Sequence, residues 1–111
     1  MFIIPEGFQY VWFKDLPAEE VEKWGTTLKP SALGALLTPV PQTGIDPKSW
    51  KISYLVTKLN DPGMPEAFQK FLIEKGRESG AQIDSIEIES GHFVQVSHVE
   101  EVAKWISNVT A

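Results

Sequence analysis

Several residue types and patterns that carry common protein functions are absent from this chain. Its 111 residues include no cysteine, which excludes disulfide bonds, catalytic thiolates and zinc sites built on cysteine. No apolar run reaches the roughly 18 residues of a membrane-spanning helix, so we expect no membrane span. Positive charge is also scarce, and the net charge of −5 argues against nucleic acid and anionic membrane surfaces as partners.

The composition that remains is typical of a soluble globular protein. Hydrophobic residues make up 42% and charged residues 23% of the chain, and its length suits one compact domain. Met1 to Glu6 lack the basic stretch and the apolar run of a secretion signal, so we expect a cytoplasmic location. The two histidines show no metal-ligand spacing and no phosphate-binding glycine loop occurs, so we expect neither a metal nor a cofactor.

Residues 1–49 predict an N-terminal arm followed by short cap-like helices. Apolar and polar positions alternate near the start, as in a short strand or an extended arm, through Phe8, Tyr10 and Trp12. Asp15 is a candidate cap for a helix that Gly25 ends. Residues 30–38 predict a second short apolar helix, and the proline-rich stretch 39–47 predicts a loop.

Residues 50–111 predict a strand–helix–strand–helix unit. Strands are expected at 50–57 and 82–88, with a helix beginning at Pro65 between them. Ser97 and Glu100 have the spacing of a capping box at the start of the last helix. Because a helix joins them, the two strands should lie parallel. The predicted fold class is therefore α/β, with a helical N-terminal segment followed by a βαβα unit in one domain.

Two parallel strands do not make a complete sheet, because both outer edges keep unpaired backbone groups. Parallel strands normally lie buried within larger sheets. We therefore expect a third strand from the N-terminus, a partner chain, or both. The partner chain would be a second copy in a homodimer or a different, complementing chain.

The sequence places an acid and a histidine at one edge of this sheet. Asp61 follows the first strand and His92 follows the second, and parallel strands bring both loops to the same carboxyl edge. The carboxylate could orient the imidazole and make it a better base, with Gly91 giving the backbone freedom to turn. The structural alternatives are a turn residue and a hydrogen-bonded loop histidine. His98, inside the capping box, is expected to be a solvated first-turn residue.

The same residues carry a resemblance to a known family. The run from Asp61 to Gln69 resembles the D-x-x-x-P-x-x-x-Q segment of α/β-hydrolases, in particular the plant esterase and hydroxynitrile-lyase group and its fungal and bacterial relatives. Ser90-Gly91-His92 resembles the segment that bears their catalytic histidine, and residues 15–35 are similar to their helical cap. The resemblance runs from about residue 13 to the end. It implies a truncated α/β-hydrolase-like fold in which Asp61 is the catalytic acid residue and His92 the catalytic histidine.

The family's serine nucleophile is missing from this pattern. No serine lies in a G-x-S-x-G motif, and the oxyanion-hole loop and the first strands of the family are absent too. The acid position itself has two candidates, since spacing from the first strand favours Asn60 and spacing to Pro65 favours Asp61. We place the acid at Asp61, because an amide cannot carry charge.

Aromatic residues indicate what such a site would bind. Trp12, Trp24, Trp50 and Phe93 are candidate substrate-binding residues, with core or interface filling as the alternative for each. They favour an apolar organic small molecule over a sugar or a phosphate.

Three functions are compatible with the pattern. The first is a small-molecule enzyme in which Asp61 and His92 perform acid/base chemistry, such as proton transfer, a lyase step or a cyclisation, in a pocket completed by oligomerisation. The second is a subunit or fragment of an esterase-type serine hydrolase whose nucleophile lies on another chain. The third is a non-catalytic binding remnant.

Overall fold

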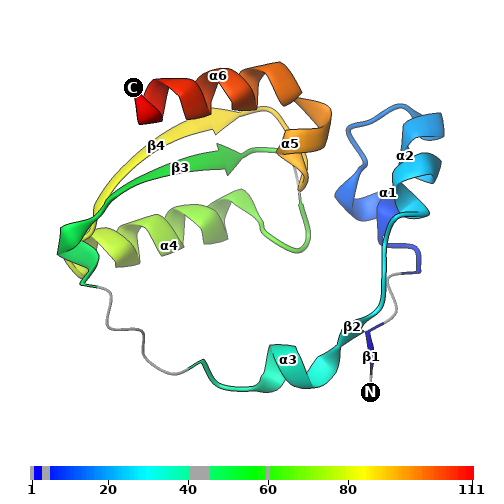
Figure 1. Ribbon diagram of the computed structural model, residues 1–111, viewed down its shortest axis with the longest axis horizontal. Helices are drawn as coiled ribbons and strands as arrows, with labels where there is room; N and C mark the ends of the chain where they lie inside the picture. Colours follow the sequence, from blue (N-terminus) through cyan, green and yellow to red (C-terminus); the bar gives the residue numbers. More distant parts are fainter. Residues whose placement is uncertain (1, 4–5, 41–45, 60) are drawn as a thin grey trace.

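The computed structural model describes residues 2–3, 6–40, 46–59 and 61–111. Its radius of gyration is 16.2 Å, whereas a compact domain of this length has one of about 13 Å. Figure 1 shows the layered sheet unit of the second half beside the short N-terminal helices, with helix α3 (Leu33–Leu37) standing apart from both. The described chain is therefore more open than a compact domain.

The second half is a βαβα unit, as its sequence pattern predicts. Strand β3 (Lys51–Thr57) pairs in parallel with β4 (Gln82–Ile88) over their whole length. Helix α4 (Glu66–Glu78) connects the strands and lies on one face of the sheet, and α6 (Val99–Thr110) lies on the other (Figure 1). The expected strands, the connecting helix, the last helix and the parallel pairing are confirmed, and the fold is broadly α/β.

A small core holds this unit together. Val56 of β3 is 1% exposed and Ile73 of α4 is 3% exposed, and Ala81 is buried immediately before β4. Gln69, which is 2% exposed, points from α4 to the end of β3 and hydrogen-bonds there to the backbone N–H and C=O of Thr57. The buried glutamine therefore fixes the end of β3, immediately before the loop that carries Asp61.

The first half differs from its sequence pattern at the aromatic residues. The predicted strand or extended arm through Phe8, Tyr10 and Trp12 is wrong, because residues Gln9–Trp12 form the short helix α1. Gly7, at φ +81°, turns the chain into this helix, and the N–H of Trp12 donates to the C=O of Phe8. Phe8 and Trp12 are four residues apart, and their rings stack at 4.8 Å. That spacing suits a helix as well as a strand.

The other N-terminal helices lie where the sequence predicts them. Helix α2 spans Ala18–Gly25, so Gly25 ends it as expected, and α3 lies within the predicted helix 30–38. The loop 39–47 falls partly outside the described residues, and its end enters the short 3-10 turn Pro47–Ser49. No helix in the described ranges is long and apolar enough to cross a membrane.

The N-terminal strand does not extend the main sheet. Strand β1 (Phe2–Ile3) pairs antiparallel with β2 (Ser31–Ala32), so the expected third strand from the N-terminus is wrong. Within the described parts of the chain, β3 and β4 therefore form a two-stranded sheet with two open edges. A partner chain at these edges stays a prediction.

Both expected helix caps are also wrong. Pro17 occupies the position before α2, and the carboxylate of Asp15 points away from this helix to Ser90 and Gly91. Ser97 is the last residue of the short helix α5 (Val94–Ser97), so His98 takes the cap position of α6, and the Ser97 hydroxyl contacts the side chains of Ser90 and His98. In both cases the polar side chain hydrogen-bonds to the loop at Ser90 and Gly91 and does not cap the nearby helix.

Candidate functional site

Asp61 and His92 meet at the carboxyl edge of the β3–β4 sheet. Hydrogen bonds continue beyond the two strands, from Lys58 N to Ile88 O (3.0 Å) and from Leu59 N to Ser90 O (3.0 Å). The loops after both strands therefore leave the sheet side by side. Nδ1 of His92 hydrogen-bonds to Oδ2 of Asp61 across them.

The carboxylate of Asp61 is held by its own loop as well as by the imidazole. Its side chain is 1% exposed, and Oδ1 accepts a hydrogen bond from Gly63 N at 2.9 Å. The N–H of Met64 donates to the backbone C=O of Asp61 and closes the turn. A carboxylate held in this way accepts a hydrogen bond from Nδ1–H of His92, which leaves Nε2 as the basic nitrogen.

Nε2 of His92 is the group that can exchange a proton. The histidine side chain is 29% exposed, and no residue of the described ranges hydrogen-bonds to Nε2. Protonation of Nε2 would create an imidazolium directly against the buried carboxylate of Asp61, which stabilises the charge. The arrangement can therefore take up and return a proton.

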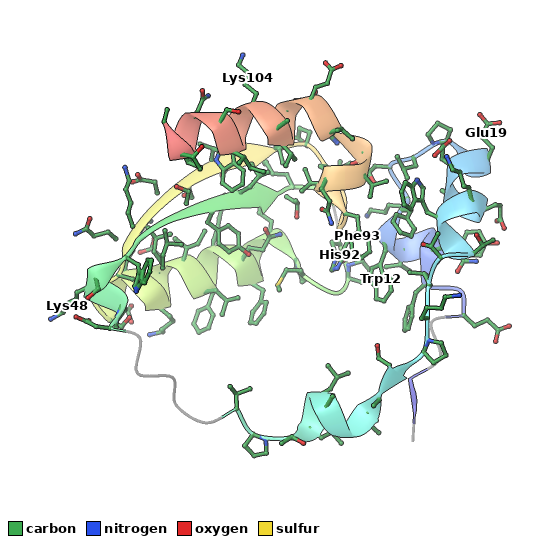
Figure 2. All side chains as sticks on the ribbon, in the orientation of Figure 1. Trp12, Glu19, Lys48, His92, Phe93 and Lys104 are labelled. Carbon is green, nitrogen blue, oxygen red and sulfur yellow. The ribbon has the colours of Figure 1, made fainter. Side chains whose placement is uncertain are left out.

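Two aromatic rings contact the imidazole. Trp12 stacks on His92 at 5.7 Å with an interplanar angle of 23°, and Phe93 meets it edge-on at 4.8 Å. Phe93 also stacks on Phe13, which is 4% exposed. Figure 2 shows Trp12, His92 and Phe93 where the sheet unit meets the N-terminal helices. This apolar setting lowers the local dielectric and strengthens the hydrogen bond between His92 and Asp61.

The structure brings two of the four predicted substrate-binding residues to the histidine. Trp12 and Phe93 contact its ring. Trp24 packs on Phe13 at 6.2 Å and donates to Glu20, without a ring contact to His92. Trp50 precedes β3, at the opposite end of the sheet, and is 62% exposed. Asn60, the alternative position for the acid, lies outside the described residues.

Asp15 is a part of the site that the sequence did not reveal. Its side chain is 7% exposed, and Oδ2 accepts hydrogen bonds from Gly91 N at 2.9 Å and from Ser90 Oγ at 3.3 Å. Burial favours the neutral acid, but the hydrogen bonds from Gly91, Ser97 and Ser90 outweigh it and hold the pKa of Asp15 below its usual value. Asp15 therefore binds the loop of His92 as a carboxylate.

His98 lies beside this carboxylate. It precedes α6 with its side chain 27% exposed, and Nδ1 lies 2.8 Å from Ser97 Oγ and 3.9 Å from Asp15 Oδ2. The expectation of a first-turn residue is wrong, because His98 precedes α6, and its partly exposed side chain has polar neighbours in Ser97 and Asp15.

Gly91 leaves space for the Asp15 carboxylate, which corrects the expectation of backbone freedom. Among the described glycines, only Gly7 and Gly80 have positive φ. A Cβ atom on Gly91 would lie 2.7 Å from Oδ1 of Asp15, which is closer than real Cβ contacts come. The missing side chain therefore lets the Asp15 carboxylate approach the backbone directly before His92. No sequence signal could have shown this, since the partners lie 76 residues apart.

The described residues include no group of three or more histidine, aspartate or glutamate side chains placed to hold a metal ion. No model of a known protein family, no curated protein and no solved structure matches this chain. The geometry around Asp61 and His92 is therefore the ground for a functional proposal.

Proposed function

We propose that this chain is an α/β-hydrolase-related small-molecule enzyme that lacks the serine nucleophile and uses an Asp61–His92 dyad for acid/base chemistry. The hydrogen bond between Nδ1 of His92 and the buried carboxylate of Asp61 carries the proposal. The exposure of the histidine side chain supports it, because Nε2 needs contact with a substrate.

The chemistry consists of proton transfer without a covalent intermediate. Nε2 of His92 removes a proton from an acidic C–H, O–H or N–H group, while Asp61 stays ionised and stabilises the imidazolium. The imidazolium then returns the proton to a leaving group or to water. Eliminations, lyase steps and cyclisations need no more than this. Trp12 and Phe93 favour a substrate that is an apolar organic molecule.

The test uses 5-nitrobenzisoxazole, whose ring opening needs one base and no nucleophile. The base takes the proton from C3, the electrons of that C–H bond form the nitrile, and the N–O bond breaks to release a coloured nitrophenolate. We expect the full chain to exceed free imidazole at equal concentration, and His92→Ala to lose ~10²–10⁴-fold in rate. Asp61→Asn keeps the shape but favours the wrong tautomer, so it should lose a similar factor.

His98→Gln is the matched control, because it removes the chain's other imidazole. Its rate should stay close to that of the unmodified protein. A rate equal to that of free imidazole, or a folded His92→Ala variant with full activity, would contradict the proposal and favour a non-catalytic binding remnant.

A second candidate is a subunit of a serine hydrolase, and the open edges of the two-stranded sheet favour it. In that case a complementing chain supplies further strands and the nucleophile, whereas the first proposal needs a homodimer to complete its pocket. Sedimentation velocity gives the mass of the purified chain in solution. A burst of nitrophenol from p-nitrophenyl acetate that requires a copurifying chain with a G-x-S-x-G motif would support the second candidate over the first.

A further inference from the structure

We propose that Asp15 is a positioning residue for His92, acting through the backbone of Gly91. This role deepens the proposed function and rests on it where the elimination rate is concerned, because Asp15 would hold the loop of the histidine that acts as the base. Its main readout is the state of the imidazole, so it can be tested even if the chain turns out to have no activity.

The first support is the place of the contact. Asp15 lies between α1 and α2, and its Oδ2 accepts the N–H of Gly91, the residue directly before His92. The same oxygen accepts from the hydroxyl of Ser90, which is 0% exposed. These two bonds fix the backbone that aims the imidazole at Asp61.

The second support is that the Asp15–Gly91 contact also places Trp12 against the imidazole. Trp12, three residues before Asp15, stacks on the imidazole. By binding Gly91, Asp15 holds the N-terminal helices against the loop, so that the ring is confined between Trp12 on one face and the Asp61 carboxylate at Nδ1. A loop that is not held in place would allow the imidazole to rotate, so that Nδ1 no longer faces Asp61.

The third support is the fit at Gly91. Its φ is not positive, so alanine is tolerated by the backbone, yet its Cβ would approach Asp15 Oδ1 to 2.7 Å. The Asp15 carboxylate therefore packs against Gly91 too closely for a methyl group to fit between them.

The experiment measures the tautomer of His92 by ¹⁵N NMR of the full chain, in which the His92→Ala variant identifies the signals of the other histidine, His98. We expect the unmodified site to hold the Nδ1–H tautomer. Asp15→Ala should mix the two tautomers and lower the elimination rate on the order of 10²-fold, because small misplacements of a base have effects of this size. Asp15→Asn, whose amide oxygen still accepts the N–H of Gly91, should keep the Nδ1–H tautomer and most of the rate.

Asp46→Ala is the matched control. Asp46 also binds a backbone N–H, that of Lys48, but at an exposed turn away from the site. It should leave the tautomer unchanged. A merely structural role of Asp15 would lower the melting temperature and leave the tautomer of the folded protein as it was, and that result would overturn the proposal.

Gly91→Ala keeps the proposal testable if Asp15→Ala does not fold. Alone, it should displace the carboxylate and mix the tautomers. In the double variant with Asp15→Ala, Gly91→Ala should change the tautomer mixture little beyond the effect of Asp15→Ala, since its clash is with the Asp15 side chain. A pure Nδ1–H tautomer in Gly91→Ala would contradict the proposal. If the unmodified chain shows no elimination activity, that result would contradict only the proposed function.

Discussion

Replacing Gln69 by leucine removes the polar atoms that fix the end of β3 while keeping a similar side-chain volume. In the native protein Oε1 accepts from Thr57 N at 3.0 Å, and Nε2 donates to Thr57 O at 2.9 Å, to Thr57 Oγ1 at 3.1 Å and to Met64 O at 2.8 Å. The substitution leaves one N–H and two C=O groups of the backbone without these partners. Thr57 is itself buried at 8% exposure.

The magnitude follows from these three backbone groups. Each buried polar group left without a partner costs about 1–3 kcal/mol. Water can reach the carbonyl of Met64, which is only partly buried, so we expect a total loss of about 3–5 kcal/mol in the free energy of unfolding. Since small domains have about 5–15 kcal/mol in all, this is a large share of the stability.

Urea unfolding followed by circular dichroism measures this loss. The matched control is Gln82→Leu, because Gln82 is exposed at the start of β4 and should change the stability by only about 0.5 kcal/mol. Gln69→Glu sharpens the test. The glutamate would turn a carboxylate oxygen toward the carbonyl oxygens of Thr57 and Met64, which raises the pKa of the glutamate in the folded state. This variant should therefore become less stable as the pH rises through that pKa.

A loss for Gln69→Leu no larger than that of the exposed control, about 0.5 kcal/mol, would refute the reasoning. It would mean that the end of β3 and the loop of Asp61 are held by the strand pairing and packing alone.

Three further predictions concern other parts of the fold. Ile73→Ala should cost about 2–5 kcal/mol in urea unfolding, since the side chain is 3% exposed in the small core. Because the pKa of Asp15 is lowered in the folded state, its contribution is present above about pH 4 and is lost as the pH falls through the folded-state pKa. Asp15→Asn should therefore lose less stability than the unmodified chain between neutral and strongly acidic pH, measured by the same unfolding. Lys70→Met, which removes the exposed bridges to Glu66 and Glu87, should have a small effect on the melting temperature that vanishes in high salt.

The sequence alone determined the α/β unit and the meeting of Asp61 with His92. The apolar periodicity of β3, β4, α4 and α6 is local information, because each element buries residues at its own spacing. Parallel pairing followed from the connecting helix, and the shared edge of the two loops followed from parallel pairing.

Only the tertiary structure decided the surroundings of this pair. Phe8 and Trp12 have a spacing that suits a strand or a helix, and the turn at Gly7 and the stacking of the rings selected the helix. Asp15 and Ser97 looked like helix caps, because a short polar side chain at a helix start normally finds its partner there. Asp15 instead found Gly91, 76 residues away. A contact between residues so distant leaves no trace in local pattern, and it becomes visible only when the folded chain brings a carboxylate to a glycine with no room for a side chain.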